Sequence, residues 1–155
     1  MAEENKSTEN RLLAALAHAS IVAQGIGILV GVLVYITQRD KSRYVAFQAL
    51  QAAVFQLVNL IITVIIWLFW GACYGLSMIP LIIQAENNPN AAPPAIFWIS
   101  MASMIIPLIF MVVVGVYGLW GGVRTWQGAD FRYLFLGGWL ERSGLWQVDS
   151  AVEEA

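Results

Sequence analysis

The sequence predicts an all-α integral membrane protein, and three observations support that class. Of its 155 residues, 59% are hydrophobic and 12% are charged, whereas a soluble domain carries about 25% charged residues. Three apolar stretches reach the roughly 20 residues that a helix needs to cross the hydrocarbon core of a bilayer. The first ten residues, MAEENKSTEN, are polar and mildly acidic, unlike the basic region that opens a secretory signal. We therefore expect three transmembrane helices in one membrane domain, residues 11–140, between polar tails at 1–10 and 141–155.

The first apolar stretch, Leu12–Thr37, fits two arrangements. Small residues recur at every fourth position and would form one stripe on an unbroken helix; this small-residue seam consists of Ala15, Ala19, Ala23, Gly27 and Gly31. Such a seam allows the close approach of a neighbouring helix in lipid, so it favours a continuous span. The alternative is a re-entrant hairpin broken near residues 24–27, which would place all eight Lys and Arg residues on one side. We expect the continuous helix and keep the hairpin as the alternative.

The second apolar stretch, residues 44–83, is too long for a single span. As one helix it would extend about 60 Å, twice the thickness of the hydrocarbon core. Tryptophan and tyrosine gather at residues 67–74, as interfacial anchors do, so we place the span at residues 55–74. Residues 44–54 then form an amphipathic lead-in. Residues 75–83, which include a proline, form a separate apolar segment at the far surface.

The third apolar stretch, about Ile96–Val123, repeats the small-residue pattern with Gly118 and Gly122. Pro107 lies inside this stretch. It predicts a kink, because proline lacks the backbone N–H that a regular helix needs.

The distribution of positive charge predicts the orientation. A basic knot of Arg39, Lys41 and Arg43 follows the first stretch and further arginines follow the third, whereas the loop at residues 84–95 has no Lys or Arg. Cytoplasmic loops of membrane proteins are enriched in these residues. We therefore expect a multi-pass protein of the cell inner (cytoplasmic) membrane, with the loop at 38–44 and the C-terminus in the cytoplasm.

An intramembrane polar face follows the basic knot. At helical spacing, five polar side chains share one side of the second stretch: Gln48, Gln51, Gln56, Asn59 and Thr63. Amides at membrane depth need partners, because an unpaired amide is costly in hydrocarbon. They would either bond to neighbouring helices, at about 0.6 kcal/mol per hydrogen bond, or line a hydrated pore. We favour the first interpretation, since three spans alone enclose little space.

The sequence contains no group of residues typical of an enzyme. All ten carboxylates lie outside the predicted spans, so we expect no buried acid pair or proton relay. His18 is the only histidine and Cys73 the only cysteine, too few for a metal site. His18 is a candidate ligand for a haem or chlorophyll metal, but a lone histidine in an apolar helix is more often a hydrogen-bonded structural residue. We expect no catalytic, cofactor or metal site.

Three short motifs resemble a bacterial membrane family of unknown function. They are RLLAALAHAS at residues 11–20, RYVAFQALQAAVFQL at residues 43–57 and GADFRYLFLG at residues 128–137. That family is related to the Tic-twenty component of chloroplast protein import and includes magnetosome-membrane members. His18 matches the family's first-helix histidine, whereas Gln48 stands where many members have a second histidine and Leu134 where many have proline. The resemblance implies a helical membrane fold and hints at protein translocation or the assembly of membrane complexes.

Together these observations favour a non-enzymatic structural, accessory or assembly subunit of a larger membrane complex. The expected partners are the lipid bilayer and other membrane subunits or further copies of the chain. The net charge of −2 and the lack of a basic face argue against nucleic acid. The alternative function is a Tic-twenty-like translocation or channel component.

Overall fold

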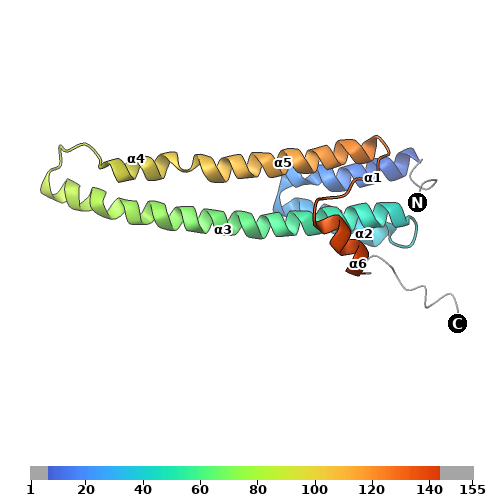
Figure 1. Cartoon of the computed structure of the whole chain (residues 1–155). Helices are drawn as coiled ribbons and strands as arrows, with labels where there is room; N and C mark the ends of the chain where they lie inside the picture. Colours follow the sequence, from blue (N-terminus) through green and yellow to red (C-terminus); the bar gives the residue numbers. More distant parts are fainter. Residues whose placement is uncertain (1–6, 144–155) are drawn as a thin grey trace. The chain divides into compact units, whose positions relative to one another are not determined.

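Helices are the only regular secondary structure in residues 7–143, the part of the chain that the computed structural model describes. The elements are α1 (Thr8–Ala19), the short 3-10 helix η2 (Ser20–Ala23), α2 (Gly25–Gln38), α3 (Arg43–Asn87), α4 (Ala95–Ala102), α5 (Ile105–Trp126) and α6 (Leu136–Ser143) (Figure 1). The all-α class is confirmed. The predicted polar tails, 1–10 and 141–155, lie mostly outside the described residues.

The chain divides into two compact units. The first contains residues 7–60 and 114–143 of the described chain, and the second contains residues 61–113. α3 and α5 each contribute to both units. All three sequence motifs belong to the first unit, which therefore holds the candidate site.

Two segments are long and apolar enough to cross a membrane. They are α3 and the stretch Ala95–Trp126, which comprises α4 and α5. α2 has 14 residues, fewer than a span requires. Length and composition therefore support two spanning segments, whereas three were predicted.

The first apolar stretch is not one continuous helix, so that prediction was wrong. η2 follows α1, and Gln24 has a positive φ of 49°. A residue with a side chain rarely adopts such a φ, and the chain reverses here, so that α1 and α2 lie side by side (Figure 1). The hydroxyl of Ser20 stabilises the reversal by donating to the carbonyl oxygens of Ala17 at 2.8 Å and Gly27 at 3.0 Å. The break falls at Gln24, within residues 24–27, where the hairpin alternative placed it.

α3 is a helix of 45 residues, about 68 Å long at roughly 1.5 Å per residue. The helix continues through residues 75–83, so the prediction of a separate segment there was wrong, whereas the predicted span at residues 55–74 lies within α3. Pro80 lies inside the helix. Proline removes a single backbone hydrogen bond, and membrane helices tolerate that loss.

The first part of α3 is buried on all sides. Each of the six residues 44–49 is at most 3% exposed. Six residues make more than one full turn of a helix, so no face of this segment is left for lipid or water. The predicted amphipathic lead-in is instead the core of the first unit.

α1 packs along this buried part of α3. Ala17 clusters with Ala49 and Ala52. Ile21, in η2 directly after α1, clusters with Phe55, about one turn further along α3. The residue numbers rise together, so the two helices run in the same direction. Alanine at the contact positions lets the backbones approach closely, and dispersion contacts accumulate between them.

The third apolar stretch breaks at residues 103–104, between α4 and α5. Pro107 explains the position, because its ring would collide with the carbonyl of Ser103 four residues earlier in a regular helix. The Ser103 carbonyl oxygen instead accepts from the N–H of Ile106 at 3.0 Å. Pro107 thus interrupts the helix rather than bending it.

Candidate functional site

A network of buried polar side chains lies in the first unit and is centred on His18. The His18 side chain is fully buried. Its Nδ1 lies 3.0 Å from the hydroxyl oxygen of Tyr133, and its Nε2 lies 2.9 Å from Oε1 of Gln48. An amide oxygen only accepts hydrogen bonds, so Nε2 carries the proton and Nδ1 accepts from the Tyr133 hydroxyl. The imidazole is therefore held in one tautomer by two residues that are distant in the sequence.

Tyr133 reaches His18 from the loop between α5 and α6. Its ring stacks on Phe55, with ring centroids 3.8 Å apart and planes at 9°. Tyr117 and Phe131 contact the Tyr133 ring edge-on. Burial raises the pKa of the Tyr133 hydroxyl, so the group stays protonated and continues to donate. The ring cluster fixes this hydroxyl against the imidazole.

Gln48 extends the network towards the surface. Its Nε2 donates to Oδ1 of Asp130 at 2.9 Å, and the other oxygen of that carboxylate accepts from Arg132 at 3.0 Å. Arg132 also pairs with Glu141 of α6 at 2.6 Å. The hydrogen bond to Asp130 raises the pKa of the Arg132 guanidinium. The network thus joins α1, α3, the loop after α5 and α6.

Gln51 and Gln56 connect α3 to further segments. Nε2 of Gln51 donates to the carbonyl oxygen of Phe131 at 3.0 Å. Nε2 of Gln56 donates to the carbonyl oxygen of Ala17 at 3.1 Å and to Oγ of Ser20 at 3.0 Å. Ala17 lies in the last turn of α1, where carbonyl groups lack a partner within the helix. Gln56 therefore closes the end of α1.

Two glycines face the remaining oxygens of these glutamines. Oε1 of Gln51 and Oε1 of Gln56 are buried without a conventional hydrogen-bond partner. A Cβ added to Gly137 would lie 2.8 Å from Oε1 of Gln51, and one added to Gly27 would lie 2.5 Å from Oε1 of Gln56. A Cβ at Gly27 would also collide with the Ser20 carbonyl oxygen, so neither glycine position has room for a side chain.

The structure brings three residues of the predicted polar face together and leaves two apart. Gln48, Gln51 and Gln56 are buried and bond to other segments of the first unit. Asn59 donates to the carbonyl oxygen of Phe55 within its own helix at 2.7 Å. Thr63 is partly exposed and belongs to the second unit.

The break in the first stretch divides the small-residue seam into two contacts. On α1, Ala15 and Ala19 lie against Gly122 of α5, where an added Cβ would be 3.2 Å from the Ala15 carbonyl oxygen. Gly118, one turn earlier on α5, packs on the side chain of Ile21. Small residues thus allow α1 and α5 to approach closely.

The second contact joins α2 to α3. Gly31 is buried, and an added Cβ would lie 3.0 Å from the Cβ of Ala53. Gly27, one turn earlier, faces Gln56 as described above. Ala23 is exposed in η2, so it takes no part in either contact.

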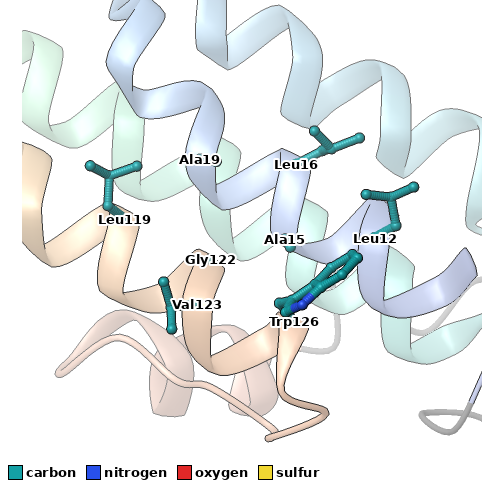
Figure 2. Close-up of a pocket in the computed structure, with 8 residues that line it drawn as sticks. All are labelled: Leu12, Ala15, Leu16, Ala19, Leu119, Gly122, Val123 and Trp126. Atoms are coloured by element: carbon teal, nitrogen blue, oxygen red, sulfur yellow. The ribbon is translucent and has the colours of Figure 1, made fainter. Parts of the chain in front are cut away.

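An apolar groove lies between α1 and α5 in the first unit (Figure 2). Its volume is about 370 Å³. The lining residues are Leu12, Ala15, Leu16 and Ala19 of α1 and Leu119, Gly122, Val123 and Trp126 of α5. Their side chains offer shape and apolar area rather than groups for acid–base or nucleophilic chemistry.

The basic knot lies at the turn between α2 and α3. Arg39, Lys41 and Arg43 are exposed, and Arg39 pairs with Asp40 at 3.5 Å. Every Lys and Arg within residues 7–143 belongs to the first unit. The charge asymmetry that predicts the orientation therefore coincides with the division into units.

Metal-binding groups do not gather within residues 7–143: no cluster of three or more His, Cys, Asp and Glu is present there. Both nitrogens of His18 are engaged by protein side chains. Cys73 is an exposed free thiol.

A known family matches most of the chain. The Magnetosome magnetite crystal formation protein family matches residues 9–140. The chain belongs to this family. No curated protein and no solved structure matches it. The predicted resemblance to a bacterial membrane family is confirmed, and its relation to Tic-twenty stays a prediction.

The match to the magnetosome family covers nearly the whole polar network, from His18 to Tyr133, and ends one residue before Glu141. Membership in a magnetosome family, together with two apolar segments of spanning length, places the protein in a membrane.

Sequence reasoning missed the C-terminal half of the network, namely Asp130, Arg132 and Tyr133. These residues lie in the motif GADFRYLFLG, which pointed to the family but not to a contact. His18 and Tyr133 are 115 positions apart, and no periodicity links a helix residue to a loop residue. The one available signal was a cluster of charged and aromatic residues directly after an apolar helix.

Proposed function

We propose that the protein is a non-enzymatic structural or assembly subunit of a larger complex in the magnetosome membrane; its membership in the Magnetosome magnetite crystal formation protein family supports the magnetosome as the location. The observation that supports this most directly is the environment of His18. The chain's only histidine is engaged at both nitrogens by Tyr133 and Gln48, so it is neither an open ligand nor a free base. The buried polar groups therefore serve to hold the domain together, and its outer surfaces meet lipid and partners.

For the membrane topology, the proposal takes the re-entrant arrangement of α1 and α2. These helices have 12 and 14 residues, which correspond to about 18 Å and 21 Å and fall short of a bilayer core of about 30 Å. With α3 and Ala95–Trp126 as the spans, the N-terminus, the basic knot and the C-terminus share the cytoplasmic side of that membrane. All eight cations then lie on that side, in agreement with the usual bias of membrane proteins.

Purification from magnetosome membranes tests the subunit role. The full-length chain, tagged and expressed in a magnetosome-forming bacterium, is extracted in a mild detergent, and its assembly is measured by size-exclusion chromatography with mass spectrometry of the bound proteins. We expect a defined complex with other membrane proteins or with further copies of the chain. A monodisperse monomer that conducts ions after reconstitution would contradict the proposal.

A translocation or channel role is the second candidate and rests on the resemblance to Tic-twenty. The polar face that would line such a pore argues against it. Gln48, Gln51 and Gln56 are each at most 4% exposed and already bond to other segments. A pore would require several copies arranged in a ring, each with this face released from its partners. Conductance measurements on the reconstituted protein separate the two functions.

A further inference from the structure

The segment that follows α5 runs back along α3 (Figure 1). Four contacts, each about one helical turn further along α3, define its path: Tyr44 with Ala129, Gln48 with Asp130, Gln51 with Phe131, and Phe55 with Tyr133. Between Tyr44 and Phe55 the helix rises about 16 Å. Side chains of α3 reach the segment at both ends of this rise, so the segment runs along the helix and away from the basic knot.

A contact with α5 shows independently how far this segment reaches along the helices. The backbone N–H of Leu134 donates to the hydroxyl of Tyr117 at 3.1 Å. Tyr117 lies nine residues before Trp126, the last residue of α5, a distance of about 14 Å along the helix axis. α6 then runs back, since Gly137 lies against Gln51. Residues 127–143 thus form a hook with its tip at Leu134 and Phe135.

The hook is polar at its open end and apolar at its tip. Arg132 pairs with both Asp130 and Glu141, and Asp130 lies at the level of Gln48. At the tip, Leu134 is 71% exposed and Phe135 is 94% exposed. Phe135 also has a φ of +66°, a conformation that persists only where the surrounding structure imposes it.

Non-helical backbone at membrane depth is stable only where its polar groups are bonded to protein. In the part of the hook that leads from α5 to the tip, side chains of α3 and α5 bond to three such groups. The Tyr44 hydroxyl donates to the carbonyl oxygen of Ala129 at 3.2 Å. Closer to the tip, Gln51 donates to the carbonyl oxygen of Phe131, and the Tyr117 hydroxyl accepts from the N–H of Leu134.

We propose that the hook inserts its tip into the apolar interior of the bilayer, as a short re-entrant element beside α3 and α5. This rests on the proposed membrane role. Lipid is the occupant that fits, because the tip lies at the level of Val116 and Trp120, which are 62% and 57% exposed on a helix of the spanning stretch. Exposed Leu and Phe side chains are stabilised by acyl chains and disfavoured by water. Trp139, 52% exposed on α6, suits the interfacial layer above the tip.

Spin labels at single cysteines test the depth of the tip. In a chain carrying Cys73→Ser, labels are attached at Phe135→Cys and, separately, at Leu134→Cys, and the protein is reconstituted in vesicles of phosphatidylcholine and phosphatidylglycerol. Val116→Cys is the matched lipid-facing control and Lys41→Cys the water-facing control. Power saturation measures collisions with oxygen, which concentrates among acyl chains, and with a water-soluble nickel chelate. We expect the oxygen-to-nickel ratio at both tip positions to match that at Val116 and to exceed that at Lys41 several-fold.

The possible results of this experiment distinguish failure of hook insertion from failure of the proposed membrane role. A tip ratio equal to that at Lys41, with Val116 still in lipid, would overturn insertion of the hook alone. A water-exposed Val116 would overturn the membrane role as well. Immobile tip labels shielded from both reagents would show that a second copy or another protein covers the tip, and would overturn the assignment to lipid.

Discussion

At the scale of single residues, His18 shows how one buried side chain joins distant parts of a chain. A neutral imidazole has one donor and one acceptor, and here these meet an amide oxygen of α3 and a hydroxyl from the loop before α6. In a buried environment each such bond is stronger than in water, and an unpaired partner is correspondingly costly. His18 therefore links α1 to α3 and to the loop before α6.

Replacing His18 should destabilise the first unit. In His18→Leu, the Tyr133 hydroxyl and the Gln48 oxygen both lose their partner, which should lower the free energy of unfolding by about 2–4 kcal/mol. Thermal unfolding in mild detergent, followed by circular dichroism, measures the loss. Tyr133→Phe provides the control in a double-mutant cycle, since it should cost less in the His18→Leu background than in the native chain. Fully additive losses would show that the two side chains are not coupled.

Gln56 and Asn59 should differ, although the sequence assigns them to the same polar face. Gln56→Leu removes the bonds to the Ala17 carbonyl and the Ser20 hydroxyl and should cost about 1 kcal/mol. Asn59→Leu removes only a bond within its own helix, so its effect should stay within about 0.5 kcal/mol. The same unfolding assay compares them. Equal losses, or conductance in the native protein that Gln56→Leu abolishes, would contradict the role of Gln56 in holding α1 to α3.

At the scale of the elements, periodicity predicted the helices but not their ends. The stripe from Ala15 to Gly31 has a strict spacing of four, yet the chain breaks at Gln24, because contacts of Ser20 and Gln56 stabilise a reversal that no local pattern encodes. At Pro80 the error was the opposite: a separate segment was expected around this proline, but α3 continues through it. At Pro107, by contrast, proline disrupts the helix as its chemistry predicts, and the break lies just before it. Local residues set helix propensity, but contacts with other segments decide whether a break forms.

The two halves of the small-residue seam give a matched pair of variants. A side chain at Gly27 would collide with the Ser20 carbonyl and with Oε1 of Gln56, so Gly27→Leu should cost about 3 kcal/mol or prevent folding. Ala23 is exposed, so Ala23→Leu should change stability by less than about 0.5 kcal/mol. Thermal unfolding and the yield of monodisperse protein measure both effects. A severe defect in Ala23→Leu would indicate instead that α1 and α2 form one continuous helix with an intact seam.

At the scale of the whole molecule, the membrane class, the helical content and the family followed from composition and three motifs, whereas the site did not. Gln48, Gln51 and Gln56 were identified because helical spacing gathers them on one face. Asp130, Arg132 and Tyr133 were not, since they contact α1 and α3 only after the chain has passed through α5 and turned back. Contacts of that kind depend on the tertiary fold, and a single sequence holds no periodic signal for them.

The two arrangements of the first stretch make different predictions for the topology of the whole chain. Single cysteines are introduced at Glu9, Lys41 and Asn88 in a Cys73→Ser background, because all three positions are exposed. Ser42 is unsuitable for labelling because it is only 3% exposed. A membrane-impermeant maleimide should label Glu9→Cys and Lys41→Cys only when it has access to the cytoplasmic side, because α1 and α2 enter and leave on that side. Asn88→Cys should label from the opposite side, since its loop follows α3 and carries no Lys or Arg.

If Glu9 and Lys41 label from opposite sides, the first stretch crosses the membrane and the re-entrant arrangement is wrong. If Lys41 and Asn88 label from the same side, α3 does not span.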